Sequence, residues 1–423
     1  MKKFGIALTA ALLTTNILMA SFASAEGDTT ETKLYNGSDF GTTEQSTVSS
    51  TGTTLTDING HWAEASIKNA EKAGYVSGYA DGTFKPNQEV SRAEFTKMLV
   101  AALGLETSGS GSTWYQPSVD AATQAGIYAN DFKGDWNKKM PRKEMTLLAV
   151  RAGISGYKKD YDINRNLYEG AKAGLIQGTA PGVIAPDGTT TRAQAIVVIE
   201  RVLSVKNGKT LASDKYATAE AEILWHKTNI YTMLPRYFSS PQYGDFNDSV
   251  MSYSIKNGKA VCSIEKFVVI DLDNPKDPNM KYIKNNDLAW LNNKYHKLKD
   301  TKNGYAVLAI TDINIKESLN NSHLDVCSIA LYNEDWYETP QTSGNSITRS
   351  HGVGMWNSKF EQLYFSFDAT KTGKFKWISG YVLPKGNFTS KKEFRLNFDQ
   401  GGTGSNSRSV PLLNSVLNPK FNQ

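Results

Sequence analysis

The stretch EVSRAEFTKMLVAAL, residues 89–103, defines one helix and points to the plan of the whole N-terminal half. Ser91 is a suitable N-cap, and Glu94 three residues later completes an S-x-x-E capping box, which marks a helix start. Apolar residues then recur at helical spacing and form one face: Phe95, Met98, Leu99, Ala102 and Leu103. The stretch therefore predicts an amphipathic helix whose first turn contains Arg92.

An arginine is an unusual choice at this end of a helix. The N-terminus carries about half a positive charge, so a cation there costs about 0.3–1 kcal/mol unless something negative compensates. The same choice returns twice, because Arg92, Arg142 and Arg192 are each 50 positions apart. Such regular spacing indicates an internal repeat.

Each copy of the repeat predicts two helices joined by a loop. An Ala-Gly pair closes the first helix, since glycine adopts the left-handed conformation that follows a helix end at little cost. These pairs are Ala73-Gly74, Ala125-Gly126 and Ala173-Gly174, and the three repeats are expected at about 54–105, 110–153 and 158–204.

The residues before the repeats predict export. The segment 1–25 has a basic start, an apolar stretch and an Ala23-Ser24-Ala25 site, which is typical of a cleaved signal peptide, and 26–53 is a Thr/Ser/Gly-rich linker. No later run reaches the roughly 18 apolar residues of a membrane span. With 47 basic and 42 acidic residues among 423, the charge of +5 is too small to indicate a nucleic-acid partner.

The C-terminal part, 205–423, has a different texture. Residues 214–234 predict one helix, and short β-rich runs separated by Asn, Gly and Pro follow it. These runs predict a β-sandwich or a related β-rich domain. The fold class is therefore α+β multidomain, with an all-α module in 54–204 and a β-rich domain after it.

The two cysteines, Cys262 and Cys327, both stand in a V-C-S-I context. This context suggests two strands that lie side by side, and an exported protein permits one disulfide bridge. The alternative is two small buried apolar residues.

The first repeat strongly resembles a surface-layer homology (SLH) motif. It has the H-W-A start at 61–63, the G-Y-x-D-G-T-F-x-P loop at 78–86 and the S-R-A-E helix start at 91–94. The third copy keeps AGLIQG and TTRAQA but lacks D-G-T-F, while the second has PRKE and YANDFKGDW in the matching places. The resemblance covers about 54–204 and does not extend further.

The resemblance implies a compact helical module of pseudo-threefold symmetry that attaches exported bacterial proteins non-covalently to the cell wall or surface layer. Its expected partner is a secondary cell wall polysaccharide carrying pyruvate ketals, and self-assembly into a surface layer is left open. The departures in copies two and three put equal use of all three binding grooves in doubt. The implied glycan-binding residues are Arg92, Arg142, Arg192, Gly78, Tyr79, Asp81, Gly82, Trp62 and Trp114.

A ketal carboxylate would explain the arginines. Free N–H groups at a helix start and a guanidinium fork together make an anion site, and an indole ring stacks on the apolar face of a sugar. In the alternative interpretation, each arginine pairs with a carboxylate such as Asp81 and only holds a loop, and the tryptophans are core residues. Asp81 lies in a D-G turn, and we expect it to orient that turn rather than to contact a ligand.

Chemistry in the C-terminal domain is not apparent from motifs. Asp271, Asp273 and Asp277 suggest either a calcium site or a solvated turn, and the EF-hand glycine and terminal glutamate are absent. The sequence has no H-E-x-x-H zinc motif and no G-x-S-x-G nucleophile motif, so no catalytic residue, cofactor or metal is assigned. We expect a wall-anchored surface protein that displays a β-rich domain, the alternative being a wall-anchored polysaccharide or cell-wall hydrolase.

Overall fold

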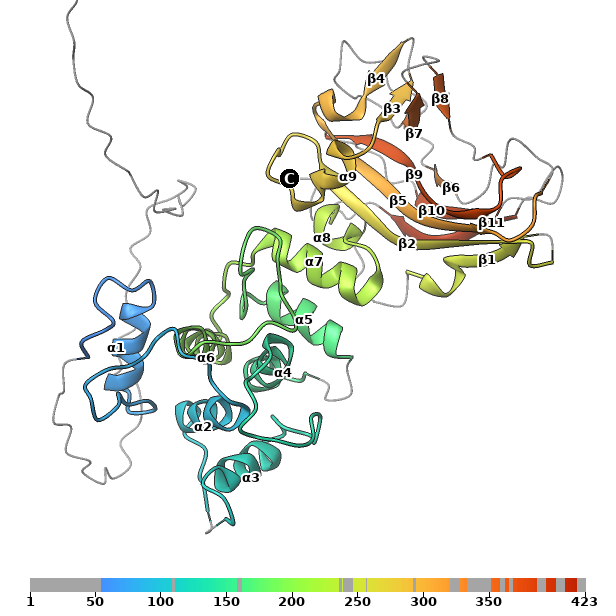
Figure 1. Cartoon of the computed structure of the whole chain (residues 1–423). Helices are drawn as coiled ribbons and strands as arrows, with labels where there is room; N and C mark the ends of the chain where they lie inside the picture. Colours follow the sequence, from blue (N-terminus) through green and yellow to red (C-terminus); the bar gives the residue numbers. More distant parts are fainter. Residues whose placement is uncertain are drawn as a thin grey trace, which may run out of the picture. The chain divides into compact units, whose positions relative to one another are not determined.

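The computed structural model describes residues 55–108, 111–157, 162–235, 238, 246–255, 257–291, 294–319, 328–332, 351–357, 362–364, 368–385, 393–400 and 408–416 (Figure 1). All of them belong to one unit of the chain, Gly52–Gln423. The predicted signal peptide at 1–25 and the linker at 26–53 lie outside the described residues. No described helix is both long and apolar enough to cross a bilayer.

The three predicted repeats each form a pair of helices. The second helix of every pair begins at the repeated arginine, as the 50-residue spacing of the arginines predicts. The pairs are α1 (Glu64–Lys72) with α2 (Arg92–Ala102), α3 (Gln116–Gln124) with α4 (Arg142–Gly153), and α5 (Ile163–Lys172) with α6 (Arg192–Lys206).

Local capping explains where the second helices begin. At α2 the Ser91 hydroxyl accepts from the N–H of Glu94, and the Glu94 carboxylate accepts from the N–H of Ser91, so both predicted bonds of the capping box are present. Thr191 and Gln194 make the same reciprocal pair at α6. α4 instead has Pro141 as its N-cap, without a side-chain bond.

The helices of the repeats close into a cycle. α2 packs on α3, α4 on α5, and α6 returns to pack on α1, while α2, α4 and α6 also contact one another. Backbone bonds close the same cycle just before these three helices. The N–H of Val90 donates to Thr190 (2.9 Å), that of Thr190 to Met140 (3.0 Å), and that of Met140 to Val90 (2.8 Å).

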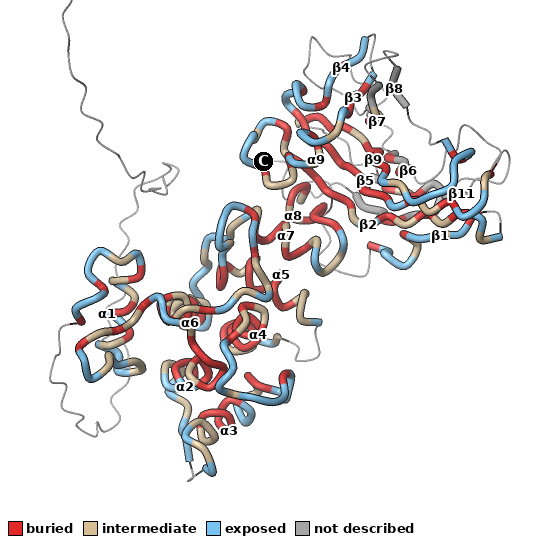
Figure 2. The backbone as a smooth tube through the Cα atoms, viewed as in Figure 1, coloured by how far each residue is buried: buried red, intermediate tan, exposed pale blue. Residues whose placement is uncertain are grey.

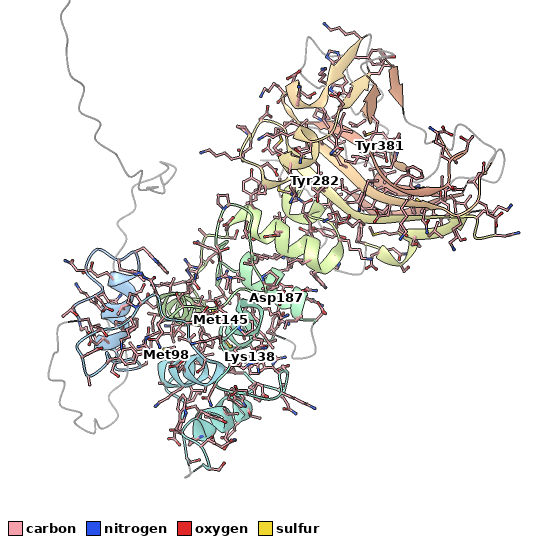
Figure 3. All side chains as sticks on the ribbon, in the orientation of Figure 1. Met98, Lys138, Met145, Asp187, Tyr282 and Tyr381 are labelled. Atoms are coloured by element: carbon pink, nitrogen blue, oxygen red, sulfur yellow. The ribbon has the colours of Figure 1, made fainter. Side chains whose placement is uncertain are left out.

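One apolar core fills the interior of this cycle. Leu99, Ala149 and Ile199 occupy equivalent places in α2, α4 and α6 and are all fully buried. Figure 2 marks buried residues of α2 and α4 in red, and Figure 3 labels Met98 and Met145, which belong to the same core. Burying such side chains supplies about 1.5–3 kcal/mol each, so the repeats are expected to fold as one module rather than singly.

The helix predicted at 214–234 is two helices. α7 (Lys215–His226) ends where Lys227 adopts the left-handed conformation (φ 60°), and α8 (Ile230–Met233) follows. The buried carboxylate of Glu222 accepts from the N–H groups of Tyr231 (3.0 Å) and Thr232 (2.8 Å), so it replaces a missing cap at the start of α8. α7 packs on α5, and α8 packs on strand β2 (Ala260–Asp271).

The C-terminal part is strand-rich and antiparallel, which confirms the α+β class. An eight-stranded sheet runs in the order β1-β2-β5-β9-β7-β3-β4, with β8 paired to β7, and a three-stranded sheet runs β11-β10-β6. A short helix, η1 (Asp248–Val250), precedes β1, while η2 (Pro278–Met280) and α9 (Lys281–Lys284) lie between β2 and β3, and η3 (Leu298–Asp300) lies between β4 and β5. The strands are β1 (Ser252–Ile255), β2 (Ala260–Asp271), β3 (Leu288–Leu291), β4 (Tyr295–Lys297), β5 (Gly304–Ile315), β6 (Ser328–Tyr332), β7 (His351–Asn357), β8 (Gln362–Tyr364), β9 (Gly373–Pro384), β10 (Glu393–Gln400) and β11 (Arg408–Val416).

The large sheet buries both of its faces. Because successive strand residues point to opposite faces, Phe267 and Val269 of β2 enter one apolar cluster, and Val268 and Ile270 enter another. The first cluster also includes Phe398 and other residues of the three-stranded sheet. Residues 267–270 of β2 and 306–310 of β5 are therefore continuous apolar runs rather than alternating ones, as expected where a sheet is covered on both sides.

The two cysteine contexts belong to different sheets. β2 pairs with β1 and β5, whereas β6, which begins directly after Cys327, pairs with β10. Within the described residues, the strands of the two V-C-S-I contexts are therefore not hydrogen-bonded neighbours. Cys262 is fully buried and is disulfide-bonded in the structure, whereas Cys327 lies outside the described residues.

Candidate functional site

The start of each second helix rests on the loop of the next repeat. The N–H of Arg92 donates to the carbonyl of Lys138 (3.0 Å), that of Arg142 to Gly188 (2.8 Å), and that of Arg192 to Gln88 (2.8 Å). The following N–H group of each helix is bonded to the same loop. The expectation that free N–H groups complete an anion site here is therefore wrong, because the loops already satisfy them.

The three arginine side chains reach into the same loops and are only 5–8% exposed. The Arg192 Nε donates to the carbonyl of Phe84 (2.8 Å), and its Nη2 donates to Ser77 (3.3 Å). The Arg142 Nε and Nη2 make the equivalent bonds to Ile184 (3.0 Å) and Gln177 (2.8 Å), 100 positions further on. We call these two places the Arg192 junction (Arg192 with 77–85) and the Arg142 junction (Arg142 with 177–185).

Arg92 is different because it has its own counter-ion. Its Nε and Nη2 hold both carboxylate oxygens of Glu144 at 2.7 and 2.6 Å, and its Nη1 donates to the carbonyls of Lys133 and Asp135. The guanidinium also lies over the Phe132 ring. The pairing with Glu144 raises the pKa of Arg92. All three nitrogens of the guanidinium are bonded inside the protein. Arg92 therefore fits the alternative interpretation, in which the arginine pairs with a carboxylate and holds a loop, although its partner is Glu144 and not Asp81.

Arg142 and Arg192 have no carboxylate partner among the described residues. Burial lowers the pKa of the Arg142 guanidinium, and Arg201 adds a second cation nearby. In each case Nε and Nη2 are held by carbonyls, and Nη1 makes no hydrogen bond within the described part of the chain. Uncompensated buried cations are costly, so these two sites favour an incoming anion.

The first-repeat loop is a tight hairpin. The N–H of Tyr79 donates to Thr83 (2.7 Å), and the Gly82 N–H returns to Tyr79 (3.0 Å). Gly82 has φ +75°, and a side chain at Gly78 would meet Leu55, so both positions favour glycine. Asp81 accepts from the N–H of Thr83 (3.0 Å) and pairs with Lys85 (3.2 Å). It therefore orients the turn, as predicted, and pairs with none of the three arginines.

The predicted loop residues gather around Arg192 rather than around Arg92. The Tyr79 ring lies 4.9 Å from the Arg192 guanidinium and 4.3 Å from the Lys85 ammonium. The Arg192 junction therefore combines two cations and an aromatic ring from repeats that are remote in sequence. Its components come from the start of α6 in the third repeat and from the loop of the first repeat, because the cycle of repeats closes between these two segments.

The third repeat has a similar hairpin, although its sequence lacks D-G-T-F and its turn-closing bond lies one position further on. The N–H of Thr179 donates to Val183 (2.8 Å), and that of Val183 donates to Ala180 (2.9 Å). Aligned by the 100-residue offset, G-T-A-P-G-V-I (178–184) keeps both glycines of G-Y-A-D-G-T-F (78–84). This glycine spacing is the sequence feature that could have predicted the hairpin of the third repeat. Thr179 takes the place of Tyr79, so the Arg142 junction lacks the corresponding ring.

Asp57 holds the first hairpin in place, a structural role that the sequence analysis did not predict. Its carboxylate accepts from the N–H groups of Phe84 (2.7 Å) and Lys85 (2.8 Å) and so fixes the end of the first hairpin. Desolvation opposes ionisation, but the bonds from these N–H groups hold the pKa of Asp57 below its usual value. In the third repeat, Glu220 of α7 takes over this role by accepting from the N–H of Ile184.

Trp62 and Trp114 are not core residues. Their side chains are 64% and 53% exposed, and each leads directly into the first helix of its repeat. The Trp62 ring lies beside His61, and the Trp114 ring is near Tyr115 and the Lys97 ammonium. The core interpretation is therefore wrong. The described contacts do not bring either ring to one of the three arginines.

The aspartates of 271–277 have an internal cation. Lys385 pairs with Asp271 and, at 2.9 Å, with Asp273, while Asp277 accepts from the N–H groups of Asp271 and Asn279. The ammonium group takes the place that a bound cation would need, which favours the interpretation as a turn. Within the described residues, no three His, Cys, Asp or Glu side chains are grouped as metal ligands.

Comparison with known proteins identifies the family that the repeats resemble. The S-layer homology domain model matches residues 54–96 and 158–196, which are the first and third repeats. The chain is 33% identical over 175 residues to an amylopullulanase of Thermoanaerobacterium thermosulfurigenes, covering 36% of this chain and 9% of that protein. It is 41% identical over 51 residues to a cellulosome-anchoring protein of Acetivibrio thermocellus, covering 12% of this chain and 11% of that protein.

A third relative is a surface-layer 125 kDa protein of Lysinibacillus sphaericus, 30% identical over 111 residues, which are 23% of this chain and 9% of that protein. The chain thus spans 9–11% of the length of these relatives. The relatives named as enzymes align only over the S-layer homology region. The N-terminal half carries S-layer homology domains, and the surface-layer and cell-surface relatives support a location at the cell wall.

Proposed function

We propose that the S-layer homology module holds this secreted protein on the bacterial cell wall by binding a secondary cell wall polysaccharide that carries pyruvate ketals. The observation that carries the proposal is the pair of buried guanidinium groups, Arg142 and Arg192, that have no carboxylate partner among the described residues. A ketal carboxylate supplies the missing charge.

Their geometry suits anion capture. Two nitrogens of each guanidinium are fixed by loop carbonyls, so the free Nη1 is already oriented and little side-chain freedom is lost on binding. Binding is non-covalent and includes a charge-assisted hydrogen bond, worth about 1.5–3 kcal/mol.

The three arginine sites are proposed to be unequal. The Arg192 junction is the principal site because Tyr79 adds a ring for the sugar and Lys85 a second cation. The Arg142 junction is the weaker site because it has no ring, and the Arg92 site is closed by Glu144.

The finer features of the fold are part of the proposal. The cyclic packing of α1–α6 supports a pseudo-threefold module, and the cluster shared by the two sheets supports a β-sandwich. We infer that the β-rich part is displayed outward as a structural or interaction domain and is not an enzyme. A zymogram of the whole secreted protein on wall and plant polysaccharides tests this inference, and a cleared zone would contradict it.

The wall-binding proposal is tested by co-sedimentation of the purified protein with cell walls, before and after chemical removal of the ketals. We expect retention on intact walls, loss of retention after ketal removal, and weaker retention as salt rises. Arg192→Ala is expected to weaken binding about ten- to hundredfold, and Lys68→Ala, which removes an exposed lysine paired with Glu64, serves as the matched control. Retention that is indifferent to the ketals would overturn the proposal.

A further inference from the structure

A second cationic surface lies in the β-rich part, far along the chain from the S-layer homology repeats. It is built on α9, β3 and β4, which are labelled in Figure 1, and on η3, which contacts both α9 and β3. Trp290 and Leu298 belong to the apolar cluster that α9, β3 and η3 share. We call it the lysine surface. Its six lysines are all exposed, namely Lys281, Lys284, Lys294, Lys297, Lys299 and Lys302.

These lysines have no ion pair within the described part of the chain, unlike several others in the same domain. Lys376 is held by Glu265 and Asp312, and Lys385 is held by Asp271 and Asp273. The segment 281–302 contains six lysines and two aspartates, Asp287 and Asp300, and therefore carries a formal charge of +4. Nearly all of the chain's formal +5 is thus concentrated in 22 residues.

The kind of cation indicates the kind of anion. The segment contains no arginine, and an ammonium is a compact point charge that suits single phosphate oxygens better than it suits the planar, bidentate carboxylate geometry. The lysines are also spread over two helices and a hairpin rather than converging on one point. This arrangement fits a chain of repeated charges better than one small anion.

The surface also has an apolar component. Leu291 and Tyr295, on the β3–β4 hairpin, are each 43% exposed, which is unusual for large apolar side chains in this domain. Tyr282 on α9, labelled in Figure 3, is half-buried beside Lys281. These groups could contact the carbon backbone of a polymer between its charges.

We propose that the lysine surface binds a linear phosphate polyanion, such as a wall polymer with phosphodiester repeats. This contact is independent of the ketal-binding junctions and would fasten the β-rich domain along the envelope. Two modest contacts on one chain strengthen retention through effective concentration without either being tight alone.

The test uses the full secreted chain, with long-chain inorganic polyphosphate as the probe. Binding is measured by fluorescence anisotropy at several salt concentrations. The variant is K284Q/K297Q/K299Q. The control is K316Q/K371Q/K374Q, three exposed lysines near the Ile315–Gly373 end of the sheet, opposite to the end where β7 pairs with β9. At low salt we expect the variant to bind about 100-fold more weakly and the control to match the unmodified protein.

The slope of log affinity against log salt should also fall by about two in the variant, as phosphate contacts are lost. Equal losses in variant and control would show non-specific attraction and overturn the proposal. So would binding to anionic phospholipid vesicles in the absence of binding to polyphosphate, or equal binding to polygalacturonate of the same charge. Because all substituted lysines are exposed, unchanged thermal unfolding is expected for both variants.

Discussion

Breaking the Arg92–Glu144 pair should damage the fold and not the function. Both side chains are about nine-tenths buried or more, and two bonds of 2.6 and 2.7 Å join them between α2 and α4. Removing one partner leaves the other as an uncompensated buried charge, so each single substitution should lower the free energy of unfolding by about 3–5 kcal/mol. Removing both avoids that penalty, so the double substitution should cost much less than the sum.

The experiment is a double-mutant cycle of Arg92→Ala and Glu144→Ala in the full chain. Hydrogen exchange of the α2 and α4 amides reports the opening free energy of the module without interference from the β-rich part. We expect a coupling energy of about 2–3 kcal/mol. The control cycle is Lys143→Ala with Asp187→Ala, an exposed pair beside the same helix start, where coupling should stay below about 1 kcal/mol. Additivity of the Arg92 and Glu144 effects within about 0.5 kcal/mol would refute the reasoning.

Three further outcomes are expected. Burial raises the pKa of Glu222 to about 8, so the folded state holds a proton that the unfolded state releases near pH 4.5. The contribution of Glu222 to the free energy of unfolding is therefore largest below pH 4.5 and falls as pH rises toward 8, by at most about 1.4 kcal/mol per pH unit. In unfolding measured as a function of pH, Glu222→Gln should flatten this part of the profile. Thiol labelling of the unfolded, unreduced protein should find no free cysteine, whereas two labelled thiols would exclude a bridge between Cys262 and Cys327. N-terminal sequencing of protein extracted from the surface should begin at Glu26, and an intact Met1 would contradict export by cleavage after Ala25.

The local features of the repeats were predictable because they depend on neighbouring residues. The S-x-x-E box fixed the start of α2, and the 50-residue period of the arginines located the other two helix starts. The left-handed turn at Lys227 was not predictable, because lysine gives no signal for a positive φ. Tertiary packing of α8 on the sheet prevails there over the helical pattern of 214–234.

The site could be predicted only in part, since its geometry is non-local. The motif supplied Arg192 and Tyr79, but only the closed cycle of helices shows that they meet across more than 100 residues. Likewise Glu144 is 52 positions from Arg92, so a search for nearby carboxylates pointed to Asp81 instead. The hairpin of the third repeat was not predicted because its backbone path depends on two glycines rather than on the side chains that define the motif.

The most direct measurement is calorimetric titration of the secreted protein with a purified, ketal-bearing wall polysaccharide fragment. We predict saturable binding with at most two sites per chain, loss of binding in R142A/R192A, and unchanged binding per folded molecule in R92A. The melting temperature of each variant is recorded on the same sample, so that loss of folded protein is separated from loss of a contact. Undiminished binding by a folded R142A/R192A variant, or three equal sites in the unmodified protein, would contradict the assignment of these junctions.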